Sequence, residues 1–268
     1  MSPPEPWVLV LSCEHGGNAV PPAYQALFAG HDELLESHRG WDPGTLELGT
    51  LLRDRLGVPL VATTVTRLLI DNNRSLGHRA LFSELSRGLG KSEKEQVVET
   101  WYTPHRSRVE DAVRAVLDNG ACVVHVGLHS FTPVLGDEPR LFDIGWLYDS
   151  RRSRERQWVD AAVARLKARR ADLRQRRNAP YLGRADGLTT SLRRRFPEER
   201  YLGIELEVNQ LHPLGPRTPW VRLMEDLIAV FLPGPRGEAP APGRCRSFGR
   251  PSREVSGLEA IGEEGQLT

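Results

Sequence analysis

The sequence predicts an α/β protein, a single domain with a mixed, largely parallel sheet flanked by helices. Short apolar runs typical of strands buried on both faces recur along the chain. Segments of ten or more residues with helical spacing separate them, which is the alternation expected of such sheets. Polar side chains also cluster in or just after four of the runs, where open α/β sheets place their ligand sites.

The first half of the chain is predicted to contain two strands, two helices and a loop. These are a strand at Trp7–Ser12, a short helix at Ala23–Phe28, a helix at Thr45–Leu56, a strand at Val58–Val65 and a loop or lid at Leu76–Lys94. Leucines at helical spacing indicate the longer helix, with Asp42 as its N-cap, Pro43 at its start and Gly57 as its stop. Glycines at positions 77, 88 and 90 favour the loop.

The second half is predicted to continue the alternation. We expect a helix at Gln96–Asn119, a strand at Ala121–His129, a strand at Ile144–Tyr148, a helix at Ser153–Arg176, a strand around Glu205–Glu207 and a helix at Val221–Phe231. From residue 233 the chain is rich in Pro, Gly, Ser and charge, without apolar periodicity. We therefore predict a domain over residues 1–232 and a disordered tail over residues 233–268.

Composition indicates a soluble globular protein. A formal net charge of +1 gives no bulk attraction to nucleic acid or membrane, and no apolar run approaches the roughly 20 residues that span a bilayer. No basic region precedes Trp7, so we expect no signal peptide. Cys13, Cys122 and Cys245 are an odd, widely spaced set. Cys13 and Cys122 lie in predicted buried strands and are interpreted as small core residues rather than disulfide partners, which favours a reducing cytoplasm.

Chemistry-bearing residues stand near the ends of the predicted strands. His15 follows the first strand and precedes two glycines, and His129 closes another. Glu205 and Glu207 alternate with apolar residues, so they share one face of their strand. Gathered at one sheet edge, these groups and Arg74 form a metallohydrolase constellation. Of the other histidines, His125 is interpreted as structural. His38 lies near Asp42 and is the only other one with a chance of a site role. All five that remain are interpreted as surface or loop residues: His31, His38, His78, His105 and His212.

Five segments together resemble the N-formylglutamate amidohydrolase family. They are Ser12–Pro21, Asp71–Arg74, His129–Pro133, Asn178–Gly183 and Glu205–Asn209. The resemblance covers roughly residues 7 to 232. It implies a phosphorylase/hydrolase-like α/β fold related to zinc carboxypeptidases, and a zinc-dependent hydrolase of N-acyl amino acids, such as N-formylglutamate, in amino-acid catabolism.

The resemblance implies a metal centre and the residues that bind the metal. His15 and His129 would bind Zn²⁺, with another divalent ion left open. The related carboxypeptidase pattern places a Glu three residues after the first His, where this chain has Asn18. We expect Asp42 as the third ligand, with Glu14 and Asn18 as alternatives.

The resemblance also assigns catalytic and substrate-binding roles. Glu207 would take a proton from the attacking water and pass it to the leaving amine, with Glu205 as the alternative. Arg74 would hold the substrate carboxylate together with Asn73, since a guanidinium grips a carboxylate bidentately. Tyr181 and Arg193 are expected to line the pocket.

Two other functions remain open from the sequence. The same metal core could cleave peptide or peptidoglycan-like amides, in which case the pocket loops would decide the substrate. A non-catalytic binding protein could also retain the fold. The feature that favours it is Asn18, which stands where the carboxypeptidase pattern has a Glu ligand. The sequence does not specify an oligomeric state.

Overall fold

The computed structural model describes residues 7–232, so the predicted tail at 233–268 lies outside the described residues. In chain order the elements are β1 (Trp7–Cys13), the 3-10 helix η1 (Pro22–Phe28), α1 (Asp32–Glu36), α2 (Thr45–Leu56), β2 (Leu60–Ala62), α3 (Lys91–Val97), the π-helical η2 (Val98–Tyr102), α4 (Thr103–Asp118), β3 (Cys122–Phe131), β4 (Val134–Leu135), β5 (Glu138–Pro139), β6 (Ile144–Leu147), α5 (Ser153–Arg169), β7 (Gln175–Arg177), α6 (Leu188–Arg193), β8 (Tyr201–Asn209) and α7 (Arg217–Phe231).

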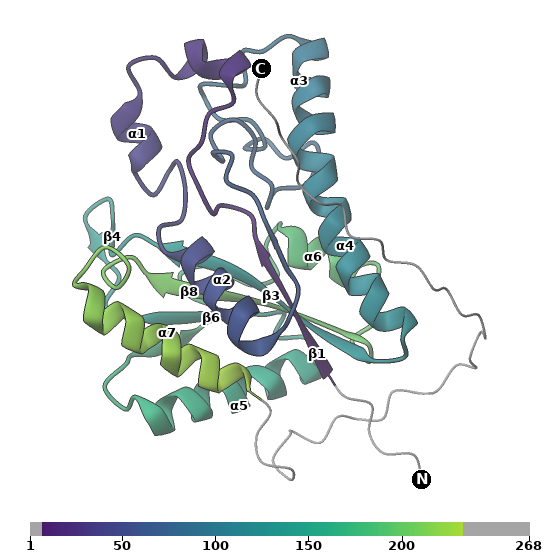
Figure 1. Cartoon of the computed structure of the whole chain (residues 1–268), viewed down its shortest axis with the longest axis vertical. Coiled ribbons are helices and arrows are strands. Elements are labelled where there is room, and N and C mark those ends of the chain that lie inside the picture. Colours follow the sequence, from purple (N-terminus) through teal and green to yellow (C-terminus); the bar gives the residue numbers. More distant parts are fainter. Residues whose placement is uncertain (1–6, 233–268) are drawn as a thin grey trace, which may run out of the picture.

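A six-stranded sheet forms the centre of the molecule, in the order β2-β1-β3-β8-β6-β7 (Figure 1). β2, β1, β3 and β8 run parallel to one another, whereas β6 is antiparallel to β8 and parallel to β7. The prediction of a mixed, largely parallel sheet flanked by helices is therefore confirmed. Every residue of β3 is buried, as expected for a central strand covered on both faces.

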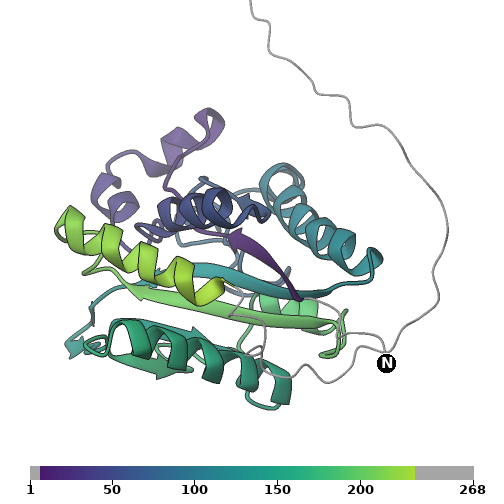
Figure 2. The same cartoon turned by 60° about the horizontal axis from the view of Figure 1, so that its bottom comes forward.

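Helices cover both faces of the sheet (Figure 2). On one face, α2, α5 and α7 pack against Val124 and Ile204 in the largest apolar cluster. On the other, α4 and α6 pack against Val123 and Tyr201. Because successive strand residues point to opposite faces, His125 and His129 of β3 lie on the α4–α6 side, as do Glu205 and Glu207 of β8.

A separate apolar cluster stabilises the loops beyond the end of β1. It joins η1, the segment after β2 and α3, and includes Phe28, Leu69 and Val97. In Figure 1 these segments lie together, away from the body of the sheet. Residues 76–90 have no helix or strand, as predicted, although α3 begins within the expected loop at Lys91.

Several predicted boundaries are wrong. The helix expected to reach Arg176 ends at Arg169, and residues 175–177 instead form the edge strand β7. Arg170 leaves helical geometry and pairs with Asp172 at 2.8 Å, which turns the chain. Gln175 then accepts a hydrogen bond from Trp146 Nε1 at 2.9 Å, and β7 joins β6.

Other elements also differ from the prediction. β2 covers only residues 60–62 of the expected strand, because the following backbone pairs with the turn after β1 (Gly16 N to Thr63 O, 3.1 Å). α6 has no predicted counterpart. α3, η2 and α4 form one continuous helical run, and α7 begins at Arg217, directly after Pro216, rather than at Val221.

Cys13 is a buried free thiol, as interpreted from the sequence. Cys122 is buried but disulfide-bonded, so that interpretation is wrong for Cys122 and no longer supports the expected reducing compartment. Cys245 lies outside the described residues. Within residues 7–232, no helix is both long and apolar enough to span a membrane.

Candidate active site and metal centre

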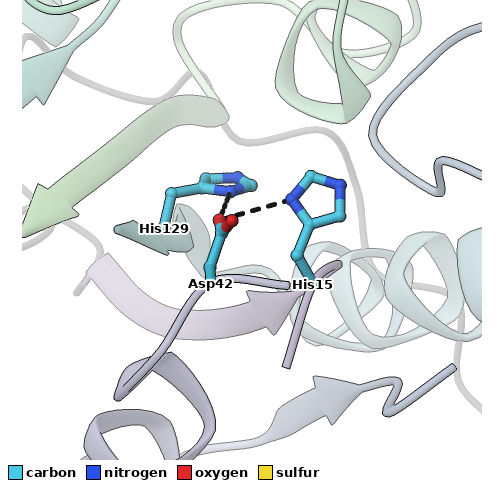
Figure 3. A group of neighbouring side chains, drawn as sticks. All are labelled: His15, Asp42 and His129. Atoms are coloured by element: carbon cyan, nitrogen blue, oxygen red, sulfur yellow. Dashed lines mark hydrogen bonds and ion pairs between the residues drawn. The ribbon is translucent and has the colours of Figure 1, made fainter. Parts of the chain in front are cut away.

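His15, Asp42 and His129 meet in one buried group (Figure 3). Asp42 Oδ2 lies 3.3 Å from His15 Nδ1 and 3.0 Å from His129 Nδ1. One ligand atom from each residue lies within 4.8 Å of the others. The three side chains expected as metal ligands therefore lie together.

The fold explains how such distant residues meet. β1 and β3 are parallel neighbours, so their carboxyl ends bring His15 and His129 to the same edge of the sheet. Asp42 arrives on the loop before α2, where its N–H donates to His15 O at 2.9 Å. Thr45 Oγ1 donates to Asp42 O at 2.8 Å at the start of α2, which fixes this loop.

Each histidine also contacts a second carboxylate through its Nε2 atom. His15 Nε2 lies 2.7 Å from Asp71 Oδ1, and His129 Nε2 lies 3.3 Å from Glu14 Oε2. Because a carboxylate only accepts hydrogen bonds, Nε2 of each ring donates to the outer carboxylate and Nδ1 donates to Asp42; Nδ1 would lose that proton to bind a metal. Metal-binding histidines commonly have this arrangement, which fixes the ring and its tautomer.

Of the alternative third ligands, neither lies in the His15–Asp42–His129 group. Glu14 is buried behind His129, with its Oε1 3.5 Å from His105 Nε2. The amide of Asn18 turns toward α1, where it donates to Leu35 O and Glu36 Oε1 at 3.2 and 3.0 Å. Asp42 is the carboxylate that the geometry supports.

The prediction that His105 is a surface or loop residue is wrong. It lies in α4 and is 1% exposed, because α4 packs against the sheet and presents this side chain to Glu14. His125 is buried and structural, as interpreted: its Nε2 lies 2.8 Å from Ser12 Oγ and its Nδ1 2.7 Å from Tyr201 Oη. His38 lines the cavity described below.

The centre combines buried carboxylates with imidazole and guanidinium neighbours. Glu14, Asp42 and Asp71 are buried, and their imidazole and guanidinium neighbours outweigh burial and hold their pKa values low. Burial alone would lower the pKa values of His15 and His129, yet the carboxylates raise both. Arg67 contacts Asp42 at 3.3 Å and Asp71 at 2.8 Å.

A cavity of about 390 Å³ opens onto the three residues. It is lined by the predicted catalytic and substrate-binding residues, namely Asn73, Arg74, Tyr181, Glu205 and Glu207, together with His15, Asp42 and His129. Arg193 does not line it. Its side chain pairs with the buried Glu155 at 3.0 Å, so its expected pocket position is wrong.

The two glutamates of β8 differ in their surroundings. Glu207 is 4% exposed, lies opposite His129 in the sheet, and has no hydrogen-bond partner at Oε2. Burial raises its pKa to about 7. Glu205 Oε1 accepts a hydrogen bond from Thr189 Oγ1 at 2.8 Å. Glu207 is thus the better placed of the two to exchange a proton near neutral pH.

Arg74 and Asn73 lie on the loop after Ile70. Arg74 donates to Asp186 O at 3.0 Å, but its Nε has no hydrogen-bond partner and lies 3.8 Å from Asp71. Its guanidinium keeps capacity for another anion. Asn73 Oδ1 accepts from Leu188 N at 2.7 Å, while its Nδ2 lies 3.5 Å from His129 Nε2.

These residues fit a divalent metal ion. Two imidazole nitrogens and one carboxylate form a donor set that leaves a position open for water or substrate. Both imidazoles have outer carboxylate partners, and the unpartnered Glu207 Oε2 lines the same cavity.

Two features of this centre could not be predicted from the sequence. Arg67 carries no motif of its own; only its position four residues before Asp71 could have suggested the pair. Asp71 lies in a segment that carries the resemblance, but its contacts with His15 and Arg67, both closer than its contact with Arg74, had no sequence signal.

Comparisons with known proteins identify relatives of the chain. The sequence model of the N-formylglutamate amidohydrolase family matches residues 7–212. A solved structure of a gene product from Agrobacterium tumefaciens is 28% identical, with a TM-score of 0.70 over 84% of this chain and 91% of that one. N-formylglutamate amidohydrolase from Ralstonia eutropha JMP134 shares the fold, at 20% identity and a TM-score of 0.62 over 85% and 93% of the two chains. No curated protein matches.

Proposed function

Since the chain belongs to the N-formylglutamate amidohydrolase family, we propose that it is a zinc-dependent enzyme that hydrolyses the formyl amide of N-formylglutamate. The observation that carries the proposal is the meeting of His15, Asp42 and His129 in one cavity with the buried, unpartnered carboxylate of Glu207.

The metal would be held by His15 Nδ1, Asp42 Oδ2 and His129 Nδ1. A bound zinc ion supplies Lewis-acid chemistry, which lowers the pKa of a water molecule and polarises the amide carbonyl. Asp71 and Glu14 keep the two imidazole rings in place through their Nε2 atoms.

Glu207 moves the proton. Its Oε2 accepts a proton from the attacking water, whose oxygen bonds to the formyl carbon. The carbon–nitrogen bond then breaks, and Glu207 returns the proton to the amide nitrogen, so that formate and glutamate leave. A carboxylate with a pKa near 7 can serve in both directions at neutral pH.

Arg74 binds a carboxylate of the substrate. Its guanidinium lines the cavity and has an Nε without a hydrogen-bond partner. The nearby Asn73 is held by Leu188 N, which leaves its amide nitrogen facing His129. This pair fixes the substrate relative to the metal ligands.

Metal analysis combined with a substrate panel tests the proposal. Purified protein is expected to carry about one zinc per chain and to hydrolyse N-formylglutamate faster than its N-acetyl and N-succinyl analogues. Glu207→Gln should keep the metal and lose about 10²- to 10⁴-fold in kcat, whereas His129→Ala should lose the metal. Protein without metal would favour a binding protein that retains the fold, and activity only on peptide amides would contradict the substrate.

A further inference from the structure

N-formylglutamate carries two carboxylates, but the cavity has one arginine assigned to substrate so far. Among the described residues, Arg39, Arg67 and Arg74 line the cavity and no lysine does. Arg67 is committed to Asp42 and Asp71, both buried, so it cannot turn to a substrate without leaving two carboxylates unpaired.

Arg39 is held far less firmly. It lies on the loop before Asp42, and its side chain is 48% exposed. Its partner is Glu84, which comes from the loop at 76–90 on another part of the cavity wall and is 39% exposed. Exposed ion pairs contribute about 0–1 kcal/mol, so another carboxylate can replace Glu84 at little cost.

We propose that Arg39 binds the side-chain carboxylate of the substrate, and that Glu84 is the internal counter-ion which this carboxylate displaces. The assignment rests on the proposed function and specifies how the glutamate side chain is selected. Arg74 then serves the carboxylate next to the scissile amide, and Arg39 the distal one.

The surroundings of Arg39 favour an anion. The pKa of the adjacent His38 is lowered first by burial and then by the charges of Arg39, Arg140 and Arg67. The electrostatic potential around Arg39 is therefore positive. Another part of the cavity wall is apolar and is the alternative binding surface for the substrate side chain. It is formed by Leu135, Tyr181 and Leu182, which are about half exposed. A substrate whose side chain packed there would not need Arg39.

Two variants and two substrates test the assignment. N-formylglutamine keeps the size of N-formylglutamate but lacks the distal charge. Arg39→Ala should raise KM for N-formylglutamate about 10- to 100-fold through loss of a charge-assisted pair, and should change KM for N-formylglutamine less than about twofold. Glu84→Gln should lower KM for N-formylglutamate up to about fivefold by removing the competing anion, without changing KM for N-formylglutamine.

Arg53→Ala is the matched control, because Arg53 forms an equally exposed pair with Asp54 outside the cavity. Equal effects of Arg39→Ala on both substrates, or no effect on either, would overturn the assignment while leaving the amidohydrolase activity intact. A wild-type enzyme that hydrolyses neither formyl amino acid would instead overturn the proposed function, and this assignment with it.

Discussion

At the scale of single residues, the centre depends on how two imidazoles are oriented. The ring of His15 lies between Asp42 and Asp71, and that of His129 between Asp42 and Glu14. Without the outer carboxylates, each ring could rotate or change tautomer and present the wrong nitrogen. Asp71 and Glu14 therefore contribute to metal affinity without contacting the metal.

Asp71→Asn tests this role of the outer carboxylates. The neutral amide is a weaker acceptor and polarises His15 less, so zinc affinity is expected to fall about 10- to 100-fold. Competition with a chromophoric chelator measures the change. Asp54→Asn, which removes an exposed carboxylate outside the cavity, should leave affinity unchanged. Equal affinities for the Asp71 variant and the wild type would refute the orienting role.

Glu207 should also couple stability to pH in the metal-free protein. Its folded pKa is raised from an ordinary 4.5 to about 7, so the folded state binds more protons than the unfolded state between these values. The stability that Glu207 contributes is full below pH 4.5 and is lost as pH rises through 7, a loss on the order of 3 kcal/mol. Glu207→Gln should remove this loss.

Urea unfolding of the metal-free proteins at pH 5 and pH 8 measures the effect. The variant should match the wild type at pH 5 and exceed its free energy of unfolding at pH 8. A difference between the two proteins that does not change with pH would show that Glu207 is not buried in the way described.

At the scale of elements, three adjacent strands are joined through one side chain. His125 of β3 lies between Ser12 of β1 and Tyr201 of β8, with both ring nitrogens within 2.8 Å of a hydroxyl oxygen. Burial lowers its pKa to about 4, so the ring stays neutral at pH 7. It supports the strands that carry the site and takes no part in the proposed chemistry.

His125→Ala is expected to lower the free energy of unfolding by about 2–4 kcal/mol, because it leaves a cavity and two buried hydroxyls without their partner. Zinc content should stay near that of the wild type, since His125 contacts no proposed ligand. Chemical unfolding together with metal analysis checks both points, with the exposed His31→Ala as control. Loss of metal in a folded His125 variant would contradict a purely structural role.

The elements also show what the sequence can predict. The strand before His15 and the strands that contain His129 and Glu207 were predicted because buried apolar runs are a local signal. β7 was missed because helical periodicity continues past Arg169, and only pairing with β6 makes residues 175–177 a strand. His105 was wrongly predicted to be a surface or loop residue, and Arg67 was not predicted to be a site residue. The contacts of His105 with Glu14 and of Arg67 with Asp71 depend on how the folded segments pack, which has no local signal in the sequence.

At the scale of the whole molecule, the metal would cross-link the loop before α2 to the ends of two adjacent strands of the sheet. Asp42 is 27 positions from His15 and 87 from His129. The loop that carries Asp42 precedes α2, whereas the histidines belong to the ends of β1 and β3. Binding therefore favours the folded state, because the unfolded chain does not hold the three ligands together.

Zinc should accordingly raise the unfolding temperature. At free zinc about 100-fold above Kd, the gain is about 2.7 kcal/mol, or about 5–10 °C for a domain of this size. Differential scanning calorimetry with zinc and with chelator measures the shift. His129→Ala removes one ligand, so its unfolding temperature should be the same in both conditions. A zinc-dependent shift that persists in this variant would mean that the ion stabilises the fold from a site other than His15, Asp42 and His129.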